Sequence, residues 1–431
     1  MTIPADDVRI AAPSGWTSEK RHVVAASFLG WTLDAFDFVL LVFVLKDIAL
    51  EFKTDITDVT FAILLTLAMR PIGAYLFGRA ADRWGRRPTL MVNVLCYSVI
   101  EFASGFSPNL TALLLLRAIF GIAMGGEWGV GASLTMESIP PHARGFVSGL
   151  LQSGYPVGFI LASIVYALLF QYIGWRGLFM VGVIPALLVF YIRRNVPESP
   201  SWAPKTAGGN TIAILRSHWR LGIYAVVLMT ALNFFGHGTQ DLYPTFLQVQ
   251  HGLSPHEVGL IVAVYNVGAI VGCVSFGSLS ERFGRRRAII MAALLSLLVL
   301  PLWAFASSTV WLAVGGFLMQ VMVQGAWGVI PVHLNELSPD EARGTFPGLV
   351  FQLGNLIASV NAPLQASIAA SFSGNYALAL ALVAGPGAVV IVILTALGIE
   401  AKGAVFGTSR VPQPAQPKIA RSPVLLSTWA R

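Results

Sequence analysis

A basic segment that occurs twice constrains the fold of this chain more than any other feature. The first copy, Gly-Arg-Ala-Ala-Asp-Arg-Trp-Gly-Arg-Arg, occupies residues 78–87, and the second, Gly-Ser-Leu-Ser-Glu-Arg-Phe-Gly-Arg-Arg, occupies 277–286, an offset of 199 residues (277 − 78). The same offset relates four further pairs: Trp128 and Trp327, Glu137 and Glu336, Arg144 and Arg343, Gly145 and Gly344. Several unrelated residue types at one spacing indicate two homologous halves in the same order.

Long apolar runs separated by short charged loops make up most of the chain. Charged residues are 11% and hydrophobic residues 55% of the 431 positions, whereas about 25% of a soluble domain is charged. A membrane-spanning helix needs about 20 apolar residues, and on that criterion we predict twelve spans, at 22–45, 58–80, 88–106, 109–133, 146–170, 175–194, 221–247, 257–280, 287–306, 309–333, 345–370 and 375–399. The expected fold is an all-α polytopic membrane protein with twelve transmembrane helices in two six-helix pseudo-repeats.

Lysine and arginine gather in alternate loops and near both ends of the chain, which sets the predicted orientation. The positive-inside bias places both termini in the cytoplasm, and it explains the net charge of +7 without nucleic-acid binding. We see no removable signal peptide, and we expect a monomer in a bacterial inner membrane. The predicted organisation is a cytoplasmic segment (1–21), a six-helix half (22–194), a cytoplasmic linker (195–220), a second six-helix half (221–400) and a disordered cytoplasmic tail (401–431).

Two parallel six-span halves with a basic loop between spans two and three of each resemble the major facilitator superfamily. The loop signature of that family, Gly-x-x-x-Asp-Arg-x-Gly-Arg-Arg, matches residues 78–87, and the second copy departs from it at Glu281. The resemblance implies a central cavity between the halves that opens alternately to each side. Six charged loop residues are candidates for a cytoplasmic latch that must break in each cycle: Asp82, Arg86, Arg144, Glu281, Arg285 and Arg343. The arginines after Asp82 could instead serve only to set topology.

Ionisable side chains inside a span each cost at least a few kcal/mol, so they are candidates for function. Those within the predicted spans are Asp34, Asp37, Arg70, Glu101, Arg117, Glu127, His237 and Asp241. The repeat helps to sort them, because charges shared by both halves are expected to serve the fold and its motion. Arg117 corresponds to Gly316 and Glu127 to Ala326, so both are better candidates for chemistry.

The first span carries two carboxylates on one face, because Asp34 and Asp37 are three residues apart. Two such groups in a medium of low dielectric constant cannot both ionise cheaply, so one could carry a proton. Alternatively, one of them pairs permanently with Arg70 or Arg117. The acids considered for proton coupling are Asp34, Asp37, Asp241 and Glu127.

The fourth span contains Arg117, whose planar guanidinium matches the geometry of a carboxylate. We predict that it binds an anionic substrate, although it could instead neutralise a fixed acid or hold helix backbones together. Arg70, which precedes Pro71 in the second span, is interpreted as structural. Glu101 is interpreted as a packing or pairing residue.

The seventh span carries a polar stripe on an otherwise apolar helix. Asn233, His237 and Asp241 recur every four residues, with Gln240 beside them, so the stripe is predicted to face a cavity rather than lipid. Pro244 lacks a backbone N–H and is predicted to kink the outer end of this span. On the tenth span, three residues are spaced to line the same cavity: Gln320, Gln324 and Trp327.

The same stripe narrows the resemblance to one branch of the superfamily. Asn-x-x-(Ser/Thr)-His-x-(Ser/Thr)-Gln-Asp-x-x-x-Thr is similar to the signature of the lactate/pyruvate:proton symporters, which group with the sialic acid:proton symporters. This chain has Gly236 where a hydroxyl is usual, which removes one possible hydrogen bond to the substrate. The resemblance implies proton-coupled uptake of a small organic acid.

We therefore predict a secondary active transporter, and not an enzyme, for a small monocarboxylate such as lactate or pyruvate. Its expected partners are the acid, protons and the lipid bilayer, and we find no sequence motif for a cofactor or a metal. The substrate-binding candidates are Arg117, Asn233, His237, Gln240 and Gln324. Sialic acid, shikimate or an aromatic acid could be carried instead. An exchanger or efflux carrier without proton coupling, or a transporter-like sensor, are further alternatives.

Overall fold

The computed structural model describes residues 16–202 and 211–406, which form helices joined by short turns. The first half contains α1 (Ser18–Phe43), α2 (Leu45–Phe52), α3 (Ile56–Trp84), α4 (Arg86–Ser104), α5 (Leu110–Gly125), α6 (Glu127–Ser138), η1 (Pro141–Ala143), α7 (Arg144–Gln152), α8 (Gly154–Val181) and α9 (Ala186–Asn195). The second contains α10 (Thr211–Ser217), α11 (Trp219–Gln240), α12 (Tyr243–Val249), α13 (Pro255–Phe283), α14 (Arg285–Phe305), α15 (Thr309–Leu337), η2 (Asp340–Ala342), α16 (Phe346–Ala358), α17 (Asn361–Ser371) and α18 (Tyr376–Leu397).

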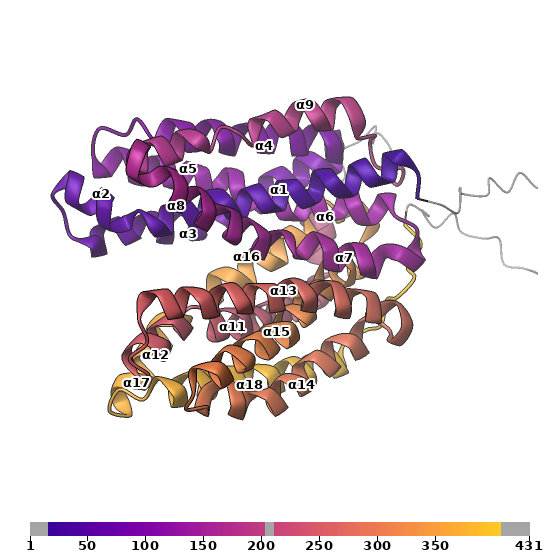
Figure 1. Ribbon diagram of the computed structural model, residues 1–431. Helices are drawn as coiled ribbons and strands as arrows, with labels where there is room; N and C mark the ends of the chain where they lie inside the picture. Colours follow the sequence, from indigo (N-terminus) through magenta and orange to yellow (C-terminus); the bar gives the residue numbers. More distant parts are fainter. Residues whose placement is uncertain (1–15, 203–210, 407–431) are drawn as a thin grey trace, which may run out of the picture.

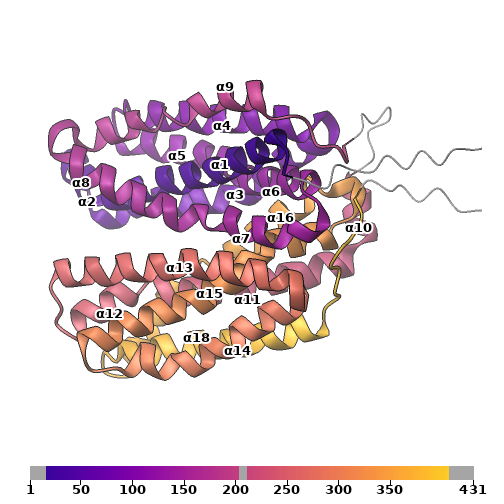
Figure 2. The ribbon, with the colours of Figure 1, turned by 45° about the vertical axis from the view of Figure 1, so that its right-hand side comes forward.

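Two helical bundles lie side by side, one from each half (Figure 1). Their ribbons meet at the end that carries both basic segments, 78–87 and 277–286, which we call the basic end, and they diverge toward the opposite end (Figure 2). Each bundle crosses six times, because several short helices join end to end into one crossing: α5 with α6, α7 with α8, α11 with α12, and α16 with α17. The predicted fold of twelve helices in two repeats is confirmed.

Nine helical stretches in the described ranges are long and apolar enough to cross a membrane by themselves. The other crossings are interrupted or polar. The sixth begins after Gly174, whose φ of 60° favours glycine, and is interrupted between Val181 and Ala186, and the eleventh is broken between α16 and α17. The third, α4, buries Arg86, Asn93 and Glu101 toward the bundle interior. Polar groups and helix breaks are tolerated at membrane depth where protein, and not lipid, surrounds them.

The seventh crossing is broken at the predicted position. α11 ends at Gln240, and α12 begins at Tyr243 with Pro244 in its first turn. Proline is tolerated there because the first N–H groups of a helix have no intrahelical acceptor. The break leaves Asp241 at the end of α11, one helical turn beyond His237.

Glycines let the two halves touch backbone to backbone near the basic end. A methyl group on Gly129 would lie 2.7 Å from Cα of Gly348, and one on Gly145 would lie 2.5 Å from the carbonyl oxygen of Gly277. Any larger side chain at these positions would push the halves apart. The halves are therefore closed against each other at this end.

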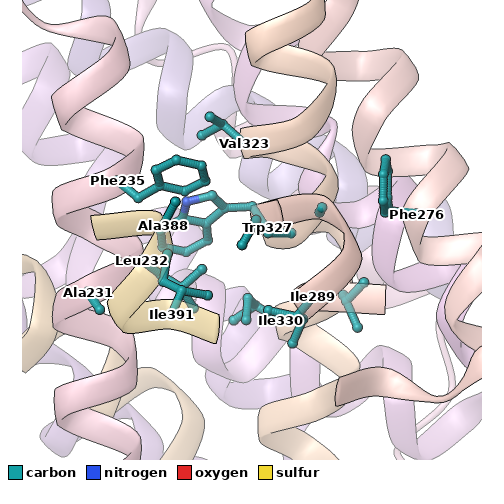
Figure 3. Packing of buried hydrophobic residues seen from close by; sticks show 14 of the residues in the cluster. Ala231, Leu232, Phe235, Phe276, Ile289, Val323, Trp327, Ile330, Ala388 and Ile391 are labelled. Carbon is teal, nitrogen blue, oxygen red and sulfur yellow. The ribbon is translucent and has the colours of Figure 1, made fainter. Parts of the chain in front are cut away.

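Trp327 of α15 lies in the apolar core of the second half, against Leu232, Phe235 and Ala388 (Figure 3). Trp327, predicted to line a cavity, is thus also a packing residue of this core. The indoles of Trp327 and its counterpart Trp128 also contact Phe351, with ring centroids 5.6 Å and 4.6 Å away respectively. Phe351 thus joins the cores of the two halves.

The predicted linker and tail are described in part. Within 195–220, α10 forms a helix that packs on η2, and residues 203–210 lie outside the described ranges. Within the tail, 401–406 are described, and 407–431 lie outside, as do 1–15 of the N-terminal segment.

Candidate functional site

A cavity of about 100 Å³ lies between the two halves, and both contribute to its lining. The lining residues of the first half are Trp31, Phe38, Leu67, Arg70, Gln152 and Tyr155, and those of the second are Asn233, Gly236, His237, Gln240, Gln324, Trp327, Phe351 and Asn355. Four of the five predicted substrate-binding residues are therefore brought together. The first half supplies the one arginine in the lining, and the second supplies amides and an imidazole.

The wall from the second half is a hydrogen-bonded polar network. His237 Nδ1 lies 3.2 Å from Asp241 Oδ1, and its Nε2 lies 3.1 Å from Asn355 Oδ1. The Gln240 amide donates to Gln320 Oε1 at 2.8 Å. The His237 and Asp241 side chains are 37% and 34% exposed, so this part of the network reaches solvent from the cavity. Asp241, predicted for proton coupling, thus lies beside the cavity through its contact with His237.

The wall from the first half contains one cation, Arg70. Its guanidinium donates to Met124 Sδ at 2.7 Å and lies over the Phe38 ring, 4.9 Å from the centroid. Its Nε is buried without a hydrogen-bond partner, and among the described residues no acid forms an ion pair with it. A weakly satisfied guanidinium on a cavity wall is suited to bind a carboxylate in a bidentate arrangement.

The structure places Arg117 elsewhere. Its side chain is fully buried inside the first half, where NH2 lies 2.6 Å from Glu101 Oε2 and donates to Ser104 Oγ at 2.6 Å. Arg117 does not line the cavity, which differs from the predicted substrate contact and matches the alternative of neutralising a fixed acid. Glu101 is that acid, and the arginine that lies on the cavity wall is instead Arg70, which was interpreted as structural.

Three predicted proton-coupling acids lie behind the cavity wall. All four carboxylate oxygens of Asp34 and Asp37, and both of Glu127, are buried without a hydrogen-bond partner. Asp37 is a neighbour of Glu101, because a methyl group on Gly182 would collide with Glu101 and lie 3.1 Å from Asp37 Oδ1. Buried carboxylates without donors are costly when ionised, so this cluster is suited to hold protons.

Two of the predicted latch arginines, Arg86 and Arg285, each pair within their own half with an acid that was not predicted to belong to the latch. Arg86 pairs with Glu137 (NH2 to Oε1, 3.0 Å), and its repeat counterpart Arg285 pairs with Glu336 (Nε to Oε2, 2.9 Å). These two acids could have been predicted as latch residues from the sequence, because the 199-residue offset relates them. The repeated residues thus build one buried ion pair per half.

Across the halves, the latch is made mainly of hydrogen bonds to backbone. Asp82 accepts from Gly344 N–H and from Thr345 Oγ1, both at 2.7 Å, and Glu281 accepts from Gly145 N–H. The arginines cross over, with Arg144 NH1 3.8 Å from Glu336 and Arg343 NH1 3.8 Å from Glu137. All six predicted latch residues therefore lie at the basic end. Asp82, Arg144, Glu281 and Arg343 contact the other half directly, whereas Arg86 and Arg285 contact residues that do so.

The chain matches the sequence profile of the Major Facilitator Superfamily over residues 27–251 and again over 226–430. The chain belongs to the major facilitator superfamily. It is similar to a carboxylic acid transporter protein homolog of Saccharomyces cerevisiae, at 32% identity over 79% of this chain and 60% of the yeast protein. This chain thus spans less than two thirds of the length of that relative.

Two further matches cover nearly the whole chain. The sialic acid transporter NanX of Escherichia coli is 28% identical over 90% of this chain and 96% of its own length. Among solved structures, the proton:xylose symporter XylE superposes with a TM-score of 0.76 over 90% of this chain and 98% of that chain, at 18% identity. The likeness to XylE shows the superfamily fold alone.

Proposed function

We propose that this protein is a proton-coupled symporter of a small organic acid, for which a monocarboxylate such as lactate or pyruvate is the best candidate. The observation that carries the proposal is the Arg70 guanidinium, which faces the amide and imidazole wall of the cavity and is in direct contact with no acid in the described part of the chain. A carboxylate would pair with Arg70, and the hydroxyl or keto group of the acid would hydrogen-bond Asn233 or Gln240. Relatives named as transporters of carboxylic acids, sialic acid and cis,cis-muconate support an organic acid as substrate.

The volume of the cavity favours a small acid. One water needs about 10–15 Å³, so a cavity of about 100 Å³ holds several waters or one small organic acid. Lactate has about six non-hydrogen atoms and sialic acid about 21, so sialic acid would require the cavity to widen. Shikimate and aromatic acids lie between these sizes and remain the alternative substrates.

In this proposal, proton coupling arises because Asp34 and the substrate carboxylate compete for Arg70. Asp34 lies on α1 one helical turn before Phe38, whose ring packs against the Arg70 guanidinium, so the two charges are near each other in a low-dielectric region. When a substrate carboxylate pairs with Arg70, Asp34 loses its counter-charge and becomes expensive to keep ionised, so it takes up a proton. One anion and one proton then enter together without adding net charge to the low-dielectric interior, which lowers the barrier to the change of state.

The structure is closed at the basic end, and the positive-inside bias assigns this end to the cytoplasm of an inner membrane. We therefore infer a state that is accessible from outside. Uptake requires the latch contacts of Asp82 and Glu281 to break and the opposite end to close. An exchanger without proton coupling would use the same two states.

The deciding experiment is uptake of labelled lactate by proteoliposomes under an acid-outside pH gradient, with unlabelled pyruvate, cis,cis-muconate and sialic acid as competitors. We expect gradient-driven accumulation that pyruvate blocks. Accumulation blocked by sialic acid alone would move the substrate to the larger acids, and lactate exchange indifferent to the gradient would favour the uncoupled carrier.

We predict that Gly129→Val destabilises the state closed at the basic end, because its side chain would overlap Gly348. Overpacking of about 1–3 kcal/mol shifts the population of this state by about 5- to 150-fold. The measurement is the electron–electron distance between nitroxides at Arg83→Cys and Arg282→Cys, both exposed at the basic end. Gly259→Val, where the added carbon meets open space, is the matched control. Identical distance distributions for the two variants would contradict the prediction.

A further inference from the structure

The chain after α18 passes from its own half to the other half at the basic end, and we call residues 400–406 the C-terminal strap. The Glu400 carboxylate accepts hydrogen bonds from the backbone N–H groups of Arg285 (3.2 Å) and Arg286 (3.1 Å) in the first turn of α14. A carboxylate at a helix N-terminus is favoured both by these N–H groups and by the helix dipole. Glu400 therefore anchors the strap to the second half.

Farther along, the strap contacts the latch. Gly403 N–H donates to Glu336 Oε1 at 3.2 Å, and the Arg144 guanidinium donates to the carbonyl oxygen of Ala404 at 2.7 Å. Arg144 begins α7 of the first half, whereas Ala404 is covalently part of the second. The strap thus adds a direct connection between the halves beyond the latch itself.

The Phe406 ring lies close to two arginines that are counterparts in the repeat. Its centroid is 3.7 Å from Cζ of Arg144 and 4.0 Å from Cζ of Arg343. Two guanidinium groups repel each other, and an aromatic ring face attracts each of them. Phe406 therefore binds one cation from each half and offsets their repulsion in the closed state.

The repeat provides an internal comparison for the strap. Glu198, which follows α9, accepts from the N–H groups of Arg86 (2.9 Å) and Arg87 (3.2 Å), just as Glu400 does for α14. As far as Trp202 the chain then contacts its own half, where Trp202 Nε1 donates to the carbonyl oxygen of Asp82 at 3.2 Å. Capping of the helix after the basic segment is thus common to both halves, whereas the contacts of Ala404 and Phe406 with Arg144 are an addition that the fold does not require.

We propose that the C-terminal strap is a clamp that stabilises the state closed at the basic end, with Phe406 as its contact across the halves. Opening of this end separates Arg144 from Arg343, so Phe406 must release at least one of them. The strap thereby sets the balance between the two states of the transporter. This role does not depend on the identity of the substrate or on proton coupling.

The test uses the full-length chain without substrate, with nitroxides at Arg83→Cys and Arg282→Cys and with Cys96 and Cys273 replaced by serine. Double electron–electron resonance then reports the ratio of open to closed basic ends. We expect Phe406→Ala to raise this ratio about tenfold, since two cation–π contacts of modest strength are lost. The readout is a distance, so a failure of the proposed transport function would leave it interpretable.

Val405→Ala is the matched control, because Val405 is the preceding residue and its side chain is 67% exposed. Its distance distribution should equal that of the parent protein. Phe406→Leu keeps an apolar side chain of similar size without the ring face, and it should open the basic end as Phe406→Ala does even if the alanine variant fails to fold. A parent-like distribution for the leucine variant, or an equal shift for Val405→Ala, would overturn the clamp.

Discussion

Arg70→Gln is expected to lower lactate uptake by at least about 100-fold, which is the loss typical of removing one partner of a buried charge pair. The side chain that remains can neither balance the substrate carboxylate nor donate two parallel hydrogen bonds to it. The rest of the described lining consists of amides, an imidazole, aromatic rings, Leu67 and Gly236, so it holds no other permanently charged group that could replace the guanidinium. Direct binding to purified protein, measured by calorimetry, should fall with uptake.

Arg70→Lys separates charge from geometry. The ammonium group keeps the positive charge but lacks the planar fork, so we expect an intermediate loss of about tenfold in apparent affinity. Arg216→Lys on α10 is the matched control, because Arg216 is exposed and far from the cavity lining. Arg70 also contacts Met124 and Phe38, so thermal melting and size-exclusion profiles must show that each variant folds. Wild-type affinity in a folded Arg70→Gln protein would reject Arg70 as the carboxylate site.

The fold could be predicted because the sequence carries it redundantly. Twelve mainly apolar segments are recognisable, nine of which in the described ranges are long and apolar enough to span by themselves, and the 199-residue offset relates the two halves independently of hydropathy. The latch could be predicted for the same reason, since Asp82 and Glu281 occupy equivalent positions in the two halves. In the closed state they accept hydrogen bonds from equivalent backbone N–H groups, those of Gly344 and Gly145. Repetition thus identifies what the fold and its motion require.

The cavity was predicted from only one of its walls. The stripe of Asn233, His237 and Gln240 is visible because polar residues at helical spacing stand out on an apolar helix. Arg70 and Arg117 are single charges on α3 and α5. Whether each side chain points into the cavity or into the bundle depends on the rotation of its helix, which one sequence does not specify. Arg70 corresponds to Ala269 in the repeat, so the criterion that favoured Arg117 would also have selected it.

Other parts of the site had weaker signals. Asn355 is one amide in an apolar run, and its contact with His237 joins residues 118 positions apart. Glu101 becomes meaningful only once the fold brings α4 against α5 and Arg117 onto its carboxylate. Contacts of this kind are set by packing between helices and leave no periodic trace in the sequence.

Asp34→Asn is expected to uncouple substrate movement from the proton gradient while leaving the substrate site intact. Asparagine has nearly the same shape and size as aspartate, and both Asp34 oxygens are buried without a hydrogen-bond donor, so no hydrogen bond within the protein is lost. In the wild type, the substrate carboxylate and Asp34 compete for Arg70, which makes binding stronger at acidic pH. In the variant, Arg70 has lost that competitor, so the affinity should no longer depend on pH, apart from protonation of the substrate itself.

The measurement for Asp34→Asn pairs two assays in the same proteoliposomes. Accumulation of labelled lactate driven by an acid-outside gradient should fall at least about tenfold, because a neutral side chain cannot carry a proton, whereas exchange of labelled for unlabelled lactate at equal pH should persist. Asp55→Asn is the matched control, since Asp55 is exposed and makes no side-chain capping bond at the start of α3. If Asp34→Asn accumulates lactate as the wild type does, the proton is carried by another acid, and Asp37, which lies beside Glu101 and is also buried without a donor, is the next position to replace. Loss of both gradient-driven accumulation and lactate exchange would instead mean that Asp34 supports the substrate site, because uncoupling alone leaves exchange unchanged.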